Sequence, residues 1–501
     1  MTKYLYGASI QGIQSFIFQT NKLKDIVGAS LLVEEACTTL FEKEFMKDAD
    51  GHFLDGEQII GAAGNIKFIF HKKKDCQRAV LLFPKRVMEH APGITISQAV
   101  VHLEEELEEK HSEDRKRALE ELEKLLRAQR NKQSKSLLYG QMCMKHSGET
   151  GLPLRVRVNK VTHKDELMDE GCMAKLDAVE HPTEGQVSLY KNLYSESVKY
   201  FDNLNVSNMT GDNSWLAIIH ADGNGLGQVV AEIGEKGSYK GKEISLSRFS
   251  KQLNEATVDA AKKACEAVKG SDGKNLLIRP VVIGGDDLTV ICRADKAIPF
   301  VREYMKAFEE NTTKMNVPLS ACAGIAFIKS SYPFYYGYEL AEMLCGEAKK
   351  DAKSEEMKKA NDDKIPSCLM FHKVQSSFVE DYETIKRKEL TPCAGHSFCF
   401  GPYYLTGQTN RWTIDDLEAM AKGLGAEDNN RVKTAIREWM TLLKEGTGKA
   451  EQKANRVDAL YEGAKKKLFD DAIKKETRGE VECHPAYDIL ALLTINTQIT
   501  K

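Results

Sequence analysis

The sequence lacks both a long apolar segment and an excess of positive charge. No apolar run in its 501 residues approaches the roughly 20 residues that a membrane-spanning helix needs. The first residues, Met1–Gly7, lack the apolar core of a signal peptide. We therefore expect a cytoplasmic protein with no membrane partner. Lys and Arg total 71 against 74 Asp and Glu, a balance that argues against a strongly basic nucleic-acid binder and gives no sign of a template channel.

Grouped cysteines are also missing. Most of the 12 cysteines lie within apolar runs, as Cys292 and Cys322 do, which is typical of reduced core residues in a cytosolic protein. Cys143, His146 and Cys172 are an incomplete ligand set, because a structural zinc site needs four ligands at suitable spacing. We favour idle or buried side chains here over a bound metal, and the sequence leaves the alternative open.

The length predicts two to four domains, and the pattern of apolar residues divides the chain into four parts. Residues 1–105 and 205–375 each alternate strands and helices in the β-α-β-β-α-β order of a ferredoxin-like fold. Residues 106–204 are helical or irregular, with a largely solvated helix at 104–136 and an amphipathic helix at 186–204. Residues 376–501 have helical spacing and no visible chemistry. The expected class is α+β: two ferredoxin-like domains with a helical middle insertion and a C-terminal helical domain.

Two acidic motifs stand out in the second of these units. A strand beginning at Trp215 ends at Asp222, directly before a glycine-rich turn. An apolar run from Pro280 stops at Gly284-Gly285-Asp286-Asp287 and then resumes, which predicts a hairpin with acids at its tip. If these strands are neighbours, Asp222 and Asp286 lie side by side. Paired carboxylates beside such a turn suit divalent metal ions and a nucleoside triphosphate.

The glycines of both motifs allow conformations and contacts that other residues do not. Gly284 and Gly285 can take the positive φ of a tight turn. The Gly223-Asn224-Gly225-Leu226-Gly227 turn lets backbone approach phosphate oxygens closely. It is neither the dinucleotide fingerprint nor a P-loop, since neither the spacing nor a Gly-Lys-Ser/Thr sequence fits. Each motif alone is also an ordinary turn, and only their combination in one domain is specific.

Two further features have both a simple and a sharper interpretation. Lys349 and Lys350 lie at the end of a predicted helix. The simpler interpretation is a solvated helix end, and the more specific one is a contact between Lys349 and a triphosphate. A nearby aromatic group either stacks a base or, as we favour, packs against the protein: Tyr332, Phe334, Tyr335 and Tyr336.

The two α/β units echo each other. Aligned on their hairpins, Gly61–Asn65 lies near the position of Gly284–Asp287. The first unit therefore lacks the carboxylate pair. We expect the second unit to carry out the chemistry and the first unit only to bind a nucleotide and shape the site.

These motifs resemble a known family. Ala221–Gly227, Gly284–Asp287 and Ser330–Tyr336 are similar to the second palm domain of the large polymerase-like subunit of type III CRISPR effectors. Ile10–Phe18 and Thr20–Gly28 resemble the first palm domain of the same family. That family is related to GGDEF-type nucleotide cyclases. The resemblance implies synthesis of cyclic oligonucleotides, usually cyclic oligoadenylates from ATP, as an alarm in antiviral defence.

The sequence departs from the family in two respects. Large subunits of this family often begin with an HD nuclease domain, but this chain contains no His-Asp dipeptide, so DNA cleavage by that route is not expected. The family's cysteine-rich zinc site is reduced here to Cys143, His146 and Cys172. We expect a protein that works alone or with an unrelated partner, and a role in guide-RNA surveillance stays open.

The mechanism that follows is metal-dependent nucleotidyl transfer. Asp222 and Asp286 are expected to hold two Mg²⁺ or Mn²⁺ ions, with Asp287 assisting, while the turn and Lys349 bind the triphosphate. The alternative is a non-catalytic scaffold that binds nucleotide or RNA in a defence complex; a template-dependent polymerase is a weaker third hypothesis. Partners in either case are nucleoside triphosphates, with RNA, other subunits and a second copy of the chain left open. The sequence does not reveal the base preference, the linkage and ring size of the product, or the trigger of the reaction.

Overall fold

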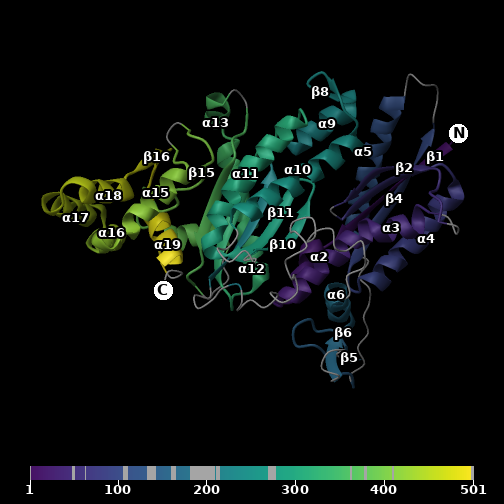
Figure 1. The fold of residues 1–501 in the computed structure, drawn as a ribbon, viewed down its shortest axis with the longest axis horizontal. Coiled ribbons are helices and arrows are strands. Elements are labelled where there is room, and N and C mark those ends of the chain that lie inside the picture. Colours follow the sequence, from purple (N-terminus) through teal and green to yellow (C-terminus); the bar gives the residue numbers. More distant parts are fainter. Residues whose placement is uncertain are drawn as a thin grey trace.

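The computed structural model describes residues 2–47, 51–62, 64–104, 111–132, 143–158, 165–180, 209, 215–268, 278–361, 364–376, 381–408 and 411–497. It is a mixed α+β structure with several sheets. Figure 1 shows an elongated molecule with the purple N-terminal elements at one end, a large teal and green sheet in the middle and yellow helices at the other end. No helix in the described ranges is both long and apolar enough to cross a membrane.

The first sheet is antiparallel in the order β2-β3-β1-β4. Its helices cover it because their apolar residues recur every three or four positions; in α4, Cys76, Ala79, Phe83 and Val87 are buried. The elements are β1 (Thr2–Gln11), α1 (Ile13–Ile17), α2 (Leu23–Cys37), α3 (Thr39–Phe45), β2 (Gly56–Ala62), β3 (Asn65–Phe70), α4 (Lys73–His90) and β4 (Thr95–Glu104).

The other face of this sheet is covered by α5 (His111–Arg130). Leu122 and Leu126 of α5 are buried in a separate apolar cluster with Leu5 of β1. A Cβ on Gly7 would lie 2.7 Å from a Leu122 methyl, so the glycine makes room for the helix. Most other described side chains of α5 are exposed, as predicted for a largely solvated helix, and a few apolar residues among many charges are enough to dock it.

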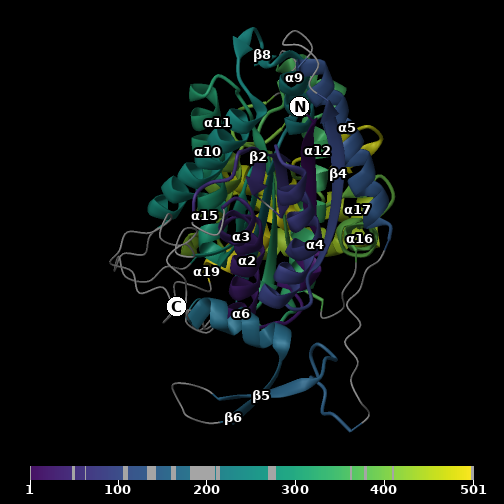
Figure 2. The same cartoon turned by 90° about the vertical axis from the view of Figure 1, so that its right-hand side faces the viewer.

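The rest of the middle region is small where it is described. It contains β5 (Leu154–Val158), β6 (Asp165–Asp169) and α6 (Glu170–Glu180), below the sheets in Figure 2. Cys143 and His146 are exposed and Cys172 is buried, and these three do not form a ligand cluster among the described residues. The helix predicted at 186–204 lies outside the described residues.

The second sheet has the order β10-β11-β7-β12-β13-β15. Its first four strands repeat the β-α-β-β-α-β order of the first sheet, and β13, parallel to β12, extends it. The elements are β7 (Trp215–Gly223), α9 (Leu226–Lys236), β8 (Ser238–Tyr239), β9 (Lys242–Glu243), α10 (Leu246–Ala267), β10 (Ile278–Gly284), β11 (Asp287–Arg293), η2 (Ala294–Lys296), α11 (Ala297–Lys314), β12 (Ala321–Lys329), α12 (Phe334–Ala352), α13 (Glu355–Ala360), β13 (Cys368–Lys373) and β15 (Tyr403–Tyr404).

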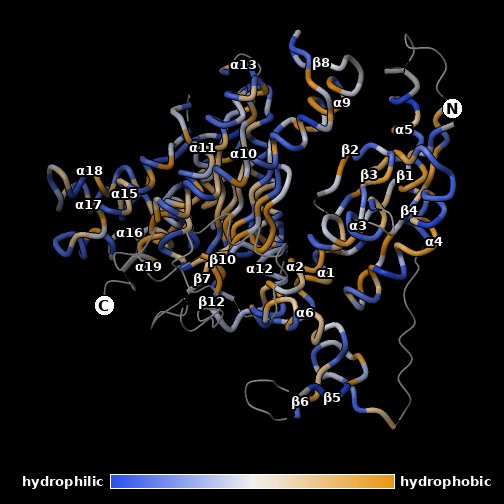
Figure 3. The backbone as a smooth tube through the Cα atoms, turned by 45° about the vertical axis from the view of Figure 1, so that its right-hand side comes forward, coloured by the Kyte–Doolittle hydropathy of each residue, from blue (hydrophilic) through white to orange (hydrophobic). Residues whose placement is uncertain are grey.

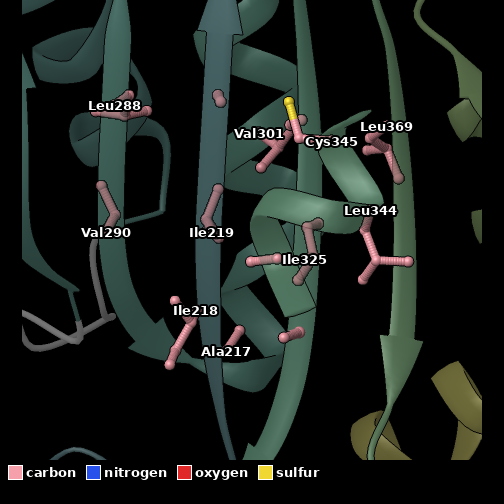
Figure 4. Packing of buried hydrophobic residues seen from close by; sticks show 14 of the residues in the cluster. Ala217, Ile218, Ile219, Leu288, Val290, Val301, Ile325, Leu344, Cys345 and Leu369 are labelled. Carbon is pink, nitrogen blue, oxygen red and sulfur yellow. The ribbon is translucent and has the colours of Figure 1, made fainter. Parts of the chain in front are cut away.

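The second sheet is buried on both faces. Helices α10 and α11 pack against each other on one side, and α12 lies along β12 and β7 on the other. This explains why β7 is a continuous apolar run rather than an alternating one. Figure 3 shows hydrophobic residues concentrated in these strands, and Figure 4 shows Ile219, Ile325 and Leu344 within this core. The acidic strand ends are thus fixed by a rigid, fully covered sheet.

The C-terminal part is mainly helical, as predicted, but it also contains a small sheet in the order β14-β17-β16. Its strands are two or three residues long, too short to leave a periodic pattern in the sequence. The elements are α14 (Tyr382–Ile385), η3 (Lys386–Leu390), β14 (His396–Ser397), α15 (Ile414–Gly425), η4 (Glu427–Asn429), α16 (Asn430–Glu445), α17 (Thr447–Leu460), α18 (Gly463–Ile473), β16 (Glu476–Arg478), β17 (Val481–Cys483) and α19 (Ala486–Thr497).

The two sheets are joined through α1 and α12. Gln14 Nε2 donates to the Tyr338 hydroxyl over 2.7 Å, and the rings of Phe18 and Tyr338 stack with centroids 4.8 Å apart. Asn21 Oδ1 accepts a 2.8 Å hydrogen bond from the backbone N–H of Phe334 at the start of α12. The N-terminal motif and the aromatic motif at 330–336, which are far apart in sequence, therefore meet in space.

Candidate functional site

The predicted acids come together at one end of the second sheet. Asp222, near the end of β7, is the direct cross-strand partner of Asp287, the first residue of β11. Gly284 pairs with Asp287, so Gly285 and Asp286 form a two-residue hairpin loop. Gly285 has φ +63°, a conformation that glycine adopts without strain. Directly opposite residues of antiparallel strands point to the same face, so the carboxylates of Asp222 and Asp287 are neighbours.

Helix α10 holds the hairpin tip in place, a contact that was not predicted from the sequence. Asn254 Oδ1 accepts a 3.2 Å hydrogen bond from the Gly285 N–H, and the Thr257 hydroxyl donates to the Gly285 carbonyl over 2.5 Å. Both groups of the Gly285 backbone are thereby held, and the position of Asp286 is set by the helix behind it.

The carboxylates perturb one another. Burial raises the pKa of Asp286 to about 7, with a further contribution from the adjacent Asp222 carboxyl, which is within hydrogen-bonding reach. Burial raises the pKa of Asp287 to about 8, and the charges of Asp222, Asp286 and Glu342 add to this. Crowded acids with too little compensating positive charge produce this pattern.

Lys349 supplies part of that positive charge. Its ammonium group hydrogen-bonds to Asp222 Oδ2 and donates to the Gly223 carbonyl over 3.1 Å. Burial alone lowers the pKa of Lys349, but the hydrogen bond and charge of Asp222 outweigh it and the pKa is raised. Lys350, in contrast, is 76% exposed and pairs with Glu347, so the solvated interpretation holds for it.

One oxygen of Asp287 is buried without a hydrogen-bond partner among the described residues. The side chain as a whole is 42% exposed, but its Oδ1 is inaccessible to solvent and lies 3.4 Å from His220 Nδ1. Burial lowers the pKa of His220 to about 4, so at neutral pH this imidazole is uncharged and no counter-ion. A buried carboxylate oxygen in this situation is a position where a bound cation would restore the missing interaction.

The three acids are neighbours but do not converge on one point. Within the described residues, Asp222, Asp286 and Asp287 do not bring one oxygen each within 4.8 Å of the others. Asp286 faces Asp222 at the tip, while Asp287 Oδ1 lies toward His220.

The glycine-rich turn is held from beneath by Asn224. Its backbone N–H donates to the Ser320 carbonyl over 2.8 Å, and its Nδ2 donates to the Ser320 hydroxyl and to Cys322 Sγ. The Asn224 side chain is buried, so it positions the turn rather than faces solvent. Gly225, with φ +76°, is the N-cap of α9. The first N–H groups of such a helix are free to bind an anion.

A cleft of about 700 Å³ opens beside the acids and the turn. Asp222 and Asp286 line it together with Gly223, Gly225 and Gly227. Lys353 and Lys358 line it as well, although no sequence pattern distinguishes them from the many other lysines. Lys349 lies behind Asp222 and is not one of the lining residues. Positive and negative groups thus face the same cavity, as binding of a metal-complexed phosphate requires.

The predicted aromatic group divides between core and surface. Phe334 is fully buried, Tyr332 and Tyr335 are partly buried against the core, and Tyr336 is 38% exposed. The packing interpretation is therefore confirmed for Phe334.

Acids on adjacent strands of a β-α-β-β-α-β sheet, beside a glycine-rich helix start, are the arrangement of a palm domain. Comparison with known families agrees: residues 215–359 match the Cas10/Cmr2 second palm domain. The resemblance to a second palm domain that the motifs in this part of the chain predicted is therefore confirmed. A search of curated proteins found no match.

Solved structures of Csm1 share the fold of the whole chain. A Csm1–Csm4 cassette in complex with cA4 aligns over 100% of this chain and 70% of its own, with 11% identity and a TM-score of 0.57. The Csm1–Csm4 subcomplex of the type III-A CRISPR-Csm interference complex aligns over the same shares, with 12% identity and a TM-score of 0.54. Csm1 of T. onnurineus aligns over 98% and 69%, with 13% identity and a TM-score of 0.53. At these identities the likeness is one of fold.

Proposed function

We propose that this protein is a metal-dependent nucleotidyltransferase that makes cyclic oligonucleotides, with ATP as its substrate, as a cytoplasmic signal in CRISPR-type antiviral defence. The observation that carries the proposal is the cross-strand pairing of Asp222 with Asp287, with Asp286 at the same sheet end and a cleft of about 700 Å³ lined by Asp222 and Asp286. Both sheets would be ferredoxin-like palm domains, at 1–105 and 205–375, linked by the middle region 106–204 and supported by the C-terminal domain 376–501.

The duplication is supported by matching details in the two sheets. Each hairpin has a two-residue loop, and in each the pairing shifts at the same distance before it, between Gln58 and Ile60 and between Pro280 and Val282. Each first strand is followed by a left-handed glycine that caps a helix, Gly12 before α1 and Gly225 before α9.

The pairing also identifies what replaces the acids in the first sheet. Ser9 pairs with Asn65, as Asp222 pairs with Asp287, and Gly64 takes the loop position of Asp286. Arg130 donates to the Ser9 hydroxyl over 3.2 Å. With no carboxylate at any of these positions, the first sheet is suited to hold an acceptor nucleotide and not to chelate a metal pair.

The donor set fits magnesium or manganese. Asp222, Asp286 and Asp287 offer hard carboxylate oxygens, the ligand type that these ions prefer. The unpartnered Asp287 Oδ1 and the raised pKa values of Asp286 and Asp287 mark a site short of positive charge. Carboxylates that face two directions suit two ions better than one. When bound, such ions favour ionisation of an attacking ribose hydroxyl and neutralise the departing pyrophosphate.

The other residues of the cleft would bind and orient the triphosphate. The backbone of Gly223–Gly227 and the start of α9 offer N–H groups, and Lys353 and Lys358 add positive charge in the same cleft. Gly284 and Gly285 shape the hairpin. Lys349 holds Asp222 in place by its hydrogen bond, so its contribution to phosphate binding would be indirect.

Adenine nucleotides and a protein partner are suggested by the similar structures. Csm1–Csm4 cassettes have been solved with AMPPNP, with pppApA and with cA4. We extend this to the present chain as a preference for ATP and as assembly with another subunit of a defence complex; RNA and a second copy of the chain are further partners to test.

The test is to incubate the purified full chain with each NTP and Mg²⁺ or Mn²⁺ and to separate the products by chromatography. We expect a cyclic oligoadenylate and pyrophosphate from ATP, and neither from the double variant Asp286→Ala/Asp287→Ala. Nucleotide binding without product from any NTP would favour the scaffold alternative. Product from the double variant at the wild-type rate would overturn the site.

A further inference from the structure

A second cluster of ligand-type side chains lies in the small C-terminal sheet, in a different part of the fold from the acidic cleft. His396 of β14 is the register partner of Glu482 of β17. His484 follows two residues after Glu482 and so points to the same side of the strand. Backbone hydrogen bonds of 2.8 Å from Glu482 to Gly395 and from His484 to Ser397 fix this register.

The ligand atoms of the three side chains lie close together. His396 Nδ1 is 3.1 Å from His484 Nε2 and 3.5 Å from Glu482 Oε2, and all three atoms lie within 4.8 Å of one another. It is the one such group of His, Cys, Asp or Glu side chains found in the described part of the chain. A tetrahedral ion with bonds of about 2.0–2.1 Å separates its ligands by about 3.3 Å, and two of these separations are close to that value.

The hydrogen bonding behind His484 points independently to a ligand. Its Nδ1 lies 3.0 Å from the backbone carbonyl of Ile473, an acceptor, so Nδ1 carries the proton. Nε2 is then left with an unprotonated lone pair, 3.1 Å from His396 Nδ1. A carbonyl behind the far ring nitrogen is the usual way that proteins orient a metal-binding imidazole. The ring is 3% exposed and meets the edge of Trp439, so its direction is fixed.

Glu482 and His396 provide the remaining ligands and an entry path. Lys475 occupies the other oxygen of Glu482, with Nζ 2.7 Å from Oε1, and leaves Oε2 facing the histidines. Glu482 is 29% exposed and His396 17% exposed at the side chain. An ion can therefore enter from solvent, and water has room to complete the coordination.

We propose that His396 Nδ1, Glu482 Oε2 and His484 Nε2 form a site for a divalent transition-metal ion of the zinc type. Two imidazoles and one carboxylate select such ions over magnesium, which prefers oxygen ligands alone. The ion would connect β14, which lies between β13 and β15 of the second sheet in the sequence, to β17, which leads into α19. Its effect is to fasten the C-terminal region, since an ion that binds only the folded state stabilises it.

The test uses the full chain, stripped with a chelator and titrated with Zn²⁺ in excess Mg²⁺, so that the acidic cleft is saturated. Bound zinc is counted by mass spectrometry, and the melting temperature is measured with and without Zn²⁺. We expect His396→Gln and Glu482→Gln each to bind one equivalent less than the wild type and to lose the zinc-dependent rise in melting temperature. Both side chains are partly exposed, so both variants are expected to fold, which circular dichroism checks.

Two controls separate this site from other zinc-binding groups. Lys475→Ala removes the neighbour of Glu482 but no ligand, and His71→Gln removes a histidine that pairs with Asp55 instead. Both should keep the full zinc count. Co²⁺ in place of Zn²⁺ should give visible absorption bands in the wild type that are weakened in His396→Gln. An equal zinc count and an equal melting shift in folded His396→Gln and wild type would overturn the proposal.

Discussion

Asp222 and Asp287 face each other directly across the β7–β11 pairing, so two carboxyl groups are held side by side at the end of the sheet. Like charges in this position are destabilising. The pKa values of Asp286 and Asp287 are raised by burial and by the neighbouring carboxylates, so ionisation of these two groups in the folded protein is unfavourable. An arrangement that sacrifices stability in this way is typical of functional sites rather than of structural ones.

The first prediction is that Asp287→Asn stabilises the apoprotein and inactivates it. The neutral amide removes the cost of burying an ionisable carboxyl group beside Asp222 and Asp286, and we expect a gain on the order of 1 kcal/mol in the free energy of unfolding. Product formation should fall at least about 100-fold, because a cation ligand is lost. Thermal unfolding without metal and pyrophosphate release from ATP measure the two effects. A variant that is both less stable and inactive would indicate a purely structural role.

The second prediction compares two glycines of the same turn. A Cβ on Gly223 would lie 2.9 Å from the Asp286 Cβ, whereas a Cβ on Gly227 meets nothing within 4 Å. Gly223→Ala should therefore push the hairpin tip away from β7 and lower product formation by at least about tenfold, since small displacements of catalytic groups are costly.

Gly227→Ala is the matched comparison: it keeps the backbone N–H and its added methyl meets no protein atom, so we expect a smaller loss of activity than for Gly223→Ala. Equal activity of the two alanine variants would show that the contact between Gly223 and Asp286 does not set the geometry of the site.

The third prediction compares two adjacent lysines. Lys349→Met removes the cation bonded to Asp222 and leaves three crowded acids. We expect a loss of about 1–3 kcal/mol in unfolding free energy, together with loss of activity that higher ATP concentrations do not restore. Lys350→Met, at an exposed position, should change stability by less than about 0.5 kcal/mol. If the activity of Lys349→Met recovers at saturating ATP, Lys349 binds the phosphate directly instead.

The local sequence pattern was enough to predict that the acidic residues lie near one another. Apolar runs ending in turn residues located β7 and the hairpin, and Asp222 and Asp286 are neighbours as expected. The register was not readable, because it depends on backbone pairing. Only the register shows that Ser9 and Asn65, rather than a loosely aligned glycine segment, replace Asp222 and Asp287.

Contributions from helices packed against the sheet could not be predicted. Asn254 and Thr257 hold the hairpin tip only because α10 docks there. Lys353 and Lys358 line the cleft because of where α12 and α13 end, and in the sequence they resemble any other lysine. The pairing of His396 with Glu482 depends on strands of two or three residues, which carry no periodic signal.

The last prediction concerns the pH dependence of stability. Asp488 of α19 is buried and accepts a 2.7 Å hydrogen bond from the Tyr403 hydroxyl. Burial raises its pKa from 3.8 to about 7. Between these pH values the folded state binds the proton that the unfolded state has released, so this group's contribution to stability decreases as the pH rises from about 4 to about 7.

Asp488→Asn should remove that decrease, because the amide stays neutral at every pH and its carbonyl can still accept from Tyr403. We expect the variant to gain stability over the wild type at pH 8 by up to a few kcal/mol, and to match it at pH 4. Urea unfolding at a series of pH values measures the difference. Asp415→Asn, at a side chain that is 78% exposed, is the control, and its curve should run parallel to that of the wild type. If the plot of unfolding free energy against pH for Asp488→Asn also runs parallel to that of the wild type, the prediction is wrong. Asp488 would then ionise as easily in the folded protein as in the unfolded chain, despite its burial.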